Sequence, residues 1–187
     1  DPGNDQNRCY VNLGGGAGPG GGGTIGFFQD QTSTRMPVVS DDSRDIEFLD
    51  LDNDSDLDIY LSNTAQLSSQ SNRWWINMGN LQGGTAGFYQ DESSSRWSGL
   101  GGAGSSIAPS QLISGGFIDF SCDCDFGDLD NDGDLDLVHS TYGGAFGGNV
   151  PTRIFLNAAG VFGEFNPSGF QLSGQQISDG NPGLWCE

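Results

Sequence analysis

The chain contains the segment Phe48-Leu49-Asp50-Leu51-Asp52-Asn53-Asp54-Ser55-Asp56-Leu57-Asp58-Ile59-Tyr60-Leu61, in which five aspartates alternate between two short apolar runs. The same pattern returns as Phe126-Gly127-Asp128-Leu129-Asp130-Asn131-Asp132-Gly133-Asp134-Leu135-Asp136-Leu137-Val138-His139. On an extended strand these carboxylates would share one face, and two charges about 5 Å apart repel by about 1 kcal/mol even in water. A tight loop around a cation removes that repulsion. Each segment therefore predicts a strand, an acidic loop and a second strand.

Calcium is the cation that such a loop favours, because this hard ion takes six to eight oxygen ligands. Loop positions 1, 3 and 5 supply carboxylates, position 7 a backbone carbonyl, and position 9 the closing carboxylate. Gly133 at position 6 permits a turn that a Cβ would hinder, whereas Ser55 stands there in the first loop. The residues predicted to form two calcium sites are Asp50, Asp52, Asp54, Asp56, Asp58, Asp128, Asp130, Asp132, Asp134 and Asp136. Magnesium, manganese or a metal-free acidic face are the alternatives.

A second pattern shows that the chain is built from repeats. The segment Asn72-Arg73-Trp74-Trp75-Ile76-Asn77 has copies in Asn7-Arg8-Cys9-Tyr10-Val11-Asn12 and Thr152-Arg153-Ile154-Phe155-Leu156-Asn157. A glycine turn follows each copy, and then Gly26-Phe27-Phe28-Gln29-Asp30, Gly87-Phe88-Tyr89-Gln90-Asp91 or Gly163-Glu164-Phe165-Asn166. Arg35 and Arg96 close the first two copies at the same offset. We define a partial first unit (7–35), a second unit (44–96), a third unit (117–170) and a C-terminal edge segment (171–187), within a single domain, 1–187.

The repeat predicts an all-β fold. Its runs are four to six residues long, rich in aromatic and β-branched residues, and bounded by Gly, Asn, Asp and Pro, and no stretch has helical periodicity. Neighbouring large residues such as Trp74 and Trp75 lie on opposite faces of a strand, so the sheet must be covered on both sides. Stacked four-stranded blades of the β-propeller type provide this cover. Two and a half units cannot close a ring, so we expect an incomplete or open one.

The acidic motif, followed by Asn-Arg-x-x-x-Asn, a glycine turn and Gly-x-Phe, resembles the FG-GAP/VCBS repeat, known from integrin α-chain propellers and bacterial surface proteins. The resemblance covers the second and third units and part of the first. It implies propeller blades with a calcium ion in the loop between the first two strands, on the aspartates named above. The chain departs from the pattern at Ser55, in the missing acidic loop of the first unit, and in its small number of units.

Charge excludes two classes of partner. Six arginines and no lysine stand against 25 acidic residues, a formal net charge of −19. A chain this acidic is repelled by nucleic acid and by anionic membrane surfaces. No apolar run of about 18 residues occurs, so no membrane span is predicted. The chain begins at Asp1, and we expect a mature or excised segment.

The cysteines favour an extracellular, oxidising location. Cys9, Cys122, Cys124 and Cys186 are an even number in a Gly/Ser-rich chain, which predicts one or two disulfides among three possible pairings. Four free thiols are the alternative, and a zinc site is disfavoured because the ligand spacing is wrong.

Other candidate sites are weaker. We expect His139 to be a strand residue, and Trp74 and Trp75 to pack in a core rather than stack on sugars. The carboxylates outside the loops, Glu47, Asp119, Asp123, Asp125 and Glu164, show no pair marked out for glycoside hydrolysis. No catalytic role is therefore predicted.

The sequence thus predicts an extracellular, calcium-stabilised structural or adhesive scaffold that self-associates, into a homo-oligomer or a filament, through open blade edges. One alternative is a module of a larger surface protein that binds a glycan or a cell-surface protein through loops near 64–71, 101–116 and 143–151. A polysaccharide-active enzyme is the third hypothesis.

Overall fold

The computed structural model describes residues 5–14, 25–64, 70–102, 105, 107, 109–119, 121–141 and 152–165. The described part is mostly β-structure, so the prediction of an all-β fold is confirmed. The glycine-rich stretch 15–24 and the C-terminal segment 171–187 lie outside the described residues. No helix in the described ranges is long and apolar enough to cross a membrane.

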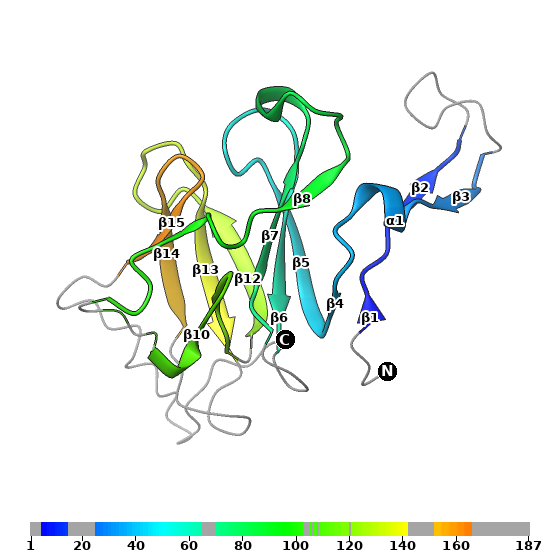
Figure 1. Ribbon diagram of the computed structural model, residues 1–187. Helices are drawn as coiled ribbons and strands as arrows, with labels where there is room; N and C mark the ends of the chain where they lie inside the picture. The colour runs from blue at the N-terminus through cyan, green and yellow to red at the C-terminus, as the bar shows by residue number, and fades with distance from the viewer. Residues whose placement is uncertain are drawn as a thin grey trace, which may run out of the picture.

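Two antiparallel sheets form the body of the molecule (Figure 1). The central sheet contains, in chain order, β5 (Ser43–Leu49), β6 (Asp58–Asn63), β7 (Arg73–Asn77) and β8 (Tyr89–Asp91). The C-terminal sheet repeats this order with β12 (Ser121–Gly127), β13 (Asp136–Thr141), β14 (Arg153–Asn157) and β15 (Phe162–Glu164). Strand β9 (Trp97–Ser98) adds to β15 in parallel. The two sheets meet where β12 packs against β5 and β6.

The described part of the first unit contributes fewer strands to the fold than the second and third units do. Strands β2 (Tyr10–Asn12) and β3 (Phe28–Asp30) form an antiparallel pair, the N-terminal hairpin, which projects from the body in Figure 1. Two further pairs join β1 (Asp5–Gln6) to β4 (Ser40–Asp41), and β10 (Leu112–Ile113) to β11 (Gly116–Phe117).

Three short helical turns accompany the strands in the described residues. A single α-turn, α1 (Thr32–Arg35), and two 3₁₀ turns, η1 (Asn80–Gln82) and η2 (Pro109–Gln111), occur in the described residues. Asp30 Oδ1 accepts a hydrogen bond from the Thr32 amide at 3.0 Å, immediately before the first of these turns. A single turn is too short to leave a 3.6-residue periodicity in the sequence.

Strand register corrects the alignment of the third unit. Asp91 lies opposite Trp75, and Glu164 lies opposite Phe155, the residue equivalent to Trp75. The counterpart of Gly87–Asp91 is therefore Gly160–Glu164, and not Gly163–Asn166 as the sequence suggested. Gly26, Gly87 and Gly160 then occupy one position, and all three have positive φ, at 82°, 75° and 82°. Glycine is favoured there because it adopts this conformation without strain.

The repeat also extends further upstream than the sequence analysis recognised. Asp41 and Asp119 stand at equivalent places before β5 and β12, and each forms an ion pair with the arginine of its unit. Arg73 Nη2 donates to Asp41 Oδ1 at 2.9 Å, and Arg153 Nη1 donates to Asp119 Oδ2 at 2.5 Å. The shared spacing Asp-x-Ser-x-Asp at 41–45 and 119–123 was the available sequence signal.

The core confirms that the central sheet is covered on both faces. Trp74 and Trp75 are adjacent on β7 and both 0% exposed. Trp74 belongs to a cluster shared with the C-terminal sheet, where its ring stacks on Phe162 with centroids 4.4 Å apart. Trp75 belongs to a second cluster, which Cys9 of the first unit and Met36, just after that unit, cover. The prediction that both indoles are core residues is therefore confirmed.

One arginine contact recurs between successive units. Arg35 Nη1 donates to the carbonyl of Gly87 at 2.9 Å, and Arg96 Nη1 donates to the carbonyl of Gly160 at 3.1 Å. Each arginine at the end of one unit therefore binds the glycine turn of the next. A side chain at either glycine would meet the guanidinium at less than 3 Å.

The packing of β7 generates the first prediction. Replacing Trp74 by alanine removes the indole between the two sheets and should lower the free energy of unfolding by about 3–5 kcal/mol. Trp74→Phe, which keeps an aromatic ring, should lower it less. Val38→Ala, at an exposed side chain, should change it by no more than about 0.5 kcal/mol. Urea unfolding followed by tryptophan fluorescence measures all three. Equal effects of Trp74→Ala and Val38→Ala would contradict the assignment of Trp74 to the core.

Candidate metal centre

The two acidic segments form loops at the same end of the two sheets (Figure 1). The first acidic loop, 50–57, connects β5 to β6, and the second, 128–135, connects β12 to β13. The predicted order of strand, acidic loop and strand is confirmed for both. Asn53 Nδ2 donates to Asp134 Oδ1 at 2.6 Å, so the two loops touch each other.

Both loops are folded by the carboxylate at position 1. Asp50 accepts hydrogen bonds from the amides of Asp54 and Ser55 at 2.9 and 3.0 Å. Asp128 accepts them from the amides of Asp132 and Gly133 at 3.1 and 3.2 Å. The chain turns back because two residues of each loop adopt the left-handed conformation: φ is 59° at Asn53 and 73° at Ser55, and 64° at Asn131 and 99° at Gly133.

These turns bring carboxylates together at two places. Oxygens of Asp50, Asp52 and Asp54 lie within 4.8 Å of one another, as do oxygens of Asp128, Asp130 and Asp136. The predicted residues outside these groups are Asp56, Asp58, Asp132 and Asp134. Asp132 Oδ1 accepts the Asp134 amide at 2.9 Å, while Asp134 Oδ2 accepts the Ala159 amide at 3.1 Å.

The carboxylate at position 9 has the same hydrogen bonds in both loops. Asp58 accepts the amides of Leu51 and Asn77 at 3.1 and 2.7 Å. Asp136 accepts the amides of Leu129 and Asn157, both at 2.8 Å. Each therefore joins the start of its acidic loop to the third strand of its sheet. A carboxylate oxygen has two lone pairs, so this hydrogen bonding leaves capacity for a metal ion.

The electrostatics of the first loop disfavour an empty, fully ionised cluster. Burial, together with the carboxylates of Asp54, Asp52 and Asp50, raises the pKa of Asp56 to about 6. Burial and Asp54 likewise raise the pKa of Asp52. Both oxygens of Asp56 and Oδ1 of Asp52 are buried without a hydrogen-bond partner. Arg96 is a basic partner of this loop, and its Nη2 lies 3.7 Å from Asp52 Oδ2.

The residues present fit a calcium ion. Both groups offer carboxylate oxygens and no nitrogen or sulfur, which is the donor set that hard cations such as calcium prefer. Buried, unpartnered carboxylate oxygens cost free energy unless a cation neutralises them. In the first loop Asp50, Asp52 and Asp54 would hold the ion, and in the second Asp128, Asp130 and Asp136.

His139 lies in a different, buried cluster. As expected, it is a strand residue of β13, and its side chain is 0% exposed. Its Nε2 lies 3.2 Å from Ser121 Oγ and 3.3 Å from Asp119 Oδ1, and its Nδ1 lies 3.3 Å from the Tyr60 hydroxyl. Burial alone would raise the pKa of Asp119, but His139 and Arg153 hold it below its usual range. Because Tyr60 belongs to the central sheet, this cluster joins the two sheets.

Several predicted features fall partly outside the described residues. Cys9 and Cys124 carry free thiols, while the side chain of Cys122 and all of Cys186 are not described, so the disulfide stays a prediction. Of the expected binding loops, residues 65–69, 103, 104, 106, 108 and 143–151 are not described. Sequence analysis missed two partners of the acidic loops, Arg96 and Asn53, because each contacts a residue more than 40 positions away in the chain: Arg96 contacts Asp52, and Asn53 contacts Asp134.

Comparisons with family models, curated proteins and solved structures gave no match.

Loop position 6 generates the second prediction. Ser55 adopts φ 73°, where a residue with a Cβ is strained by about 1–2 kcal/mol, and its equivalent is Gly133. Ser55→Gly should therefore stabilise the protein, by less than about 1 kcal/mol because glycine also loses more entropy on folding. Gly133→Ser should destabilise it by about 1 kcal/mol. Thermal unfolding measures both, and shifts of the same sign would contradict the equivalence of the two loops.

Proposed function

We propose that this protein is an extracellular structural or adhesive scaffold whose repeats are stabilised by two calcium ions. The observation that carries the proposal is the pair of acidic loops, which share position, turn conformation and hydrogen bonds. A metal-free, solvated acidic face would not explain why two loops share this conformation and each gather a cluster of carboxylates. Calcium in this role holds the fold and performs no chemistry on a substrate.

The architecture supports blades of the propeller type. The second and third units each form four consecutive antiparallel strands, and they pack face to face. An equivalent arginine–glycine contact joins the first unit to the second and the second to the third. We propose on this basis that the chain belongs among FG-GAP/VCBS repeat proteins, as an open array of blades.

Contacts of the acidic loops with the neighbouring unit explain how calcium would stabilise the whole array. Asn157 Nδ2 in the third unit donates to the carbonyls of both Leu51 and Leu135, at 3.1 Å each. Arg96 contacts Asp52 and also Gly160 of the third unit. An ion that orders the first loop therefore also orders the interface between units.

A role without catalysis fits the buried polar cluster. The arrangement of Ser121, His139 and Asp119 includes the residue types of a hydrolase, but their side chains are inaccessible to a substrate. Asp119 is further held by Arg153, as Asp41 is held by Arg73 in the second unit. Because both units contain this ion pair, the repeat accounts for it without a catalytic role.

Calcium titration tests the proposal. Isothermal titration calorimetry of the chelator-treated protein should give two calcium ions per chain. Each site should stabilise the fold by about 2.7 kcal/mol at a calcium concentration one hundred times its dissociation constant. Chelation should therefore lower the unfolding temperature and weaken the far-UV β-signal. A protein whose stability is indifferent to calcium and to chelator would overturn the proposal.

Matched variants assign the sites. Asp128→Asn combined with Asp130→Asn should reduce the stoichiometry from two to one, because the second loop loses two charged ligands. Asp5→Asn removes one acidic charge at an exposed position of β1 and should leave two ions bound. Loss of calcium binding in the Asp5 variant would show that net charge, and not the loops, attracts the ion.

A further inference from the structure

The packing of successive units defines two kinds of sheet face. The trailing face of a unit carries the positions of Tyr60, Trp74 and Ile76, and the leading face carries those of Trp75 and Tyr89. In the body of the molecule, the trailing face of the central sheet packs on Leu137, Phe155 and Phe162, which form the leading face of the C-terminal sheet. Cys9, at the position of Trp74, likewise lies against the leading face of the central sheet. The same type of interface therefore occurs twice.

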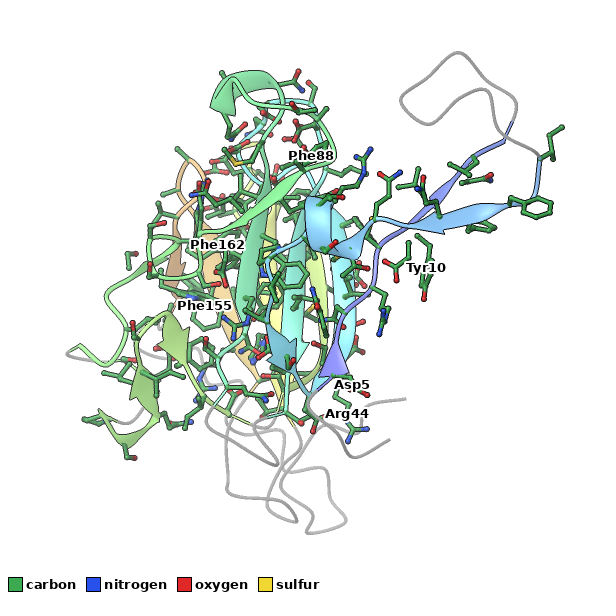
Figure 2. All side chains as sticks on the ribbon, turned by 45° about the vertical axis from the view of Figure 1, so that its right-hand side comes forward. Asp5, Tyr10, Arg44, Phe88, Phe155 and Phe162 are labelled. Atoms are coloured by element: carbon green, nitrogen blue, oxygen red, sulfur yellow. The ribbon has the colours of Figure 1, made fainter. Side chains whose placement is uncertain are left out.

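The leading face of the first unit has no such cover in the described structure. Tyr10 occupies the position of Trp75, and Phe28 that of Tyr89 and Phe162. Tyr10 is 56% and Phe28 62% exposed, whereas Trp75 and Phe162 are each 0% exposed. Figure 2 shows Tyr10 on the projecting N-terminal hairpin, away from Phe155 and Phe162 in the body.

On the leading face of the central sheet, the first unit leaves part of strand β5 uncovered. The first unit has no equivalents of β5 and β6 in the described residues, and Ile46 and Phe48 of β5 are exposed. Their equivalents in the third unit, Cys124 and Phe126, pack in the core against the complete second unit. Exposure of an apolar residue on a leading face therefore marks the absence of a preceding layer.

At the other end of the chain, the third unit presents a trailing face. Val138, Ile154 and Leu156 occupy the positions of Tyr60, Trp74 and Ile76. These three side chains are half-buried and belong to neither core cluster. The molecule therefore carries an apolar trailing face at one end and an exposed aromatic leading face at the other.

We propose that these two faces bind each other in different copies of the chain, so that the protein associates head to tail. The occupant of each face is a second copy, because the interface would repeat the type of contact that already joins its units. The two surfaces differ, so the contact is heterologous and each copy can recruit another. This inference rests on the proposed scaffold function and names its partner and surfaces.

One element of the internal interface is missing between copies. The third unit has Gly169 at the position of Arg35 and Arg96, so no arginine from this position would reach the turn at Gly26 of the next copy. Each chain also carries a formal charge of −19, which opposes association. We therefore expect a reversible contact that strengthens as salt screens the repulsion.

Complementary variants test the inference. In calcium-containing buffer, sedimentation velocity of the unaltered chain should show species larger than a monomer that grow with protein concentration. Tyr10→Thr with Phe28→Thr should weaken this association at least about tenfold, and Ile154→Thr with Leu156→Thr should do the same. Mixing the two variants should restore a one-to-one dimer and nothing larger, because each retains one intact face.

A matched control and three outcomes decide the result. Leu81→Thr alters an exposed leucine of η1, outside both faces, and should associate like the unaltered chain. A monomeric unaltered chain, association that survives both face variants, or a mixture that stays monomeric would overturn the head-to-tail contact. Calorimetry on the same samples distinguishes the two proposals. Calcium binding without association would support the calcium sites and overturn the head-to-tail contact. Association without calcium binding would support the head-to-tail contact and overturn the calcium sites.

Discussion

The fold depends on one constraint: strand β7 carries a large indole on each face, so the central sheet has to be covered twice. Trp74 is buried against the C-terminal sheet, and Trp75 against Cys9 of the first unit and the adjoining Met36. An indole buries on the order of 150–250 Å², so leaving either face open would forfeit a large part of the core. The layering around the central sheet follows from this, since each of its two faces packs against a neighbouring unit.

Polar contacts then fix how the layers align. Hydrophobic burial is not directional, and it would accept several arrangements of one sheet on another. The bonds from Arg35 to Gly87 and from Arg96 to Gly160 select one of them, because a guanidinium reaches the carbonyl only in a narrow range of positions. The buried carboxylates of Asp58 and Asp136 do the same within each unit, by joining the loop to the third strand.

The acidic loops and the stacked layers are therefore parts of one arrangement. Each loop begins at the carboxylate that folds it and ends at the carboxylate that anchors it, and its neighbours include residues of the adjacent unit. A cation in such a loop would act on the interface between units as well as on its own hairpin. This coupling connects the proposed calcium sites with the packing of one unit on another.

The sequence by itself determined the all-β fold, the two acidic hairpins and the burial of both tryptophans, because each depends on a local pattern. Alternation, turn residues and repeat position can all be read from neighbouring residues. The sequence misplaced the last strand of the third unit, since Gly160–Glu164 and Gly163–Asn166 both contain a glycine followed by a phenylalanine.

Only the tertiary structure decided the long-range polar contacts: Arg96 with Asp52 and Gly160, Asn53 with Asp134, and the cluster of His139, Asp119 and Tyr60. These partners lie far apart in the chain, and nothing local in the sequence distinguishes them from other polar residues. It also decided which apolar side chains stay exposed at the ends. Tyr10 and Trp75 hold the same position in the repeat, but in the described part of the chain a neighbouring layer buries only Trp75.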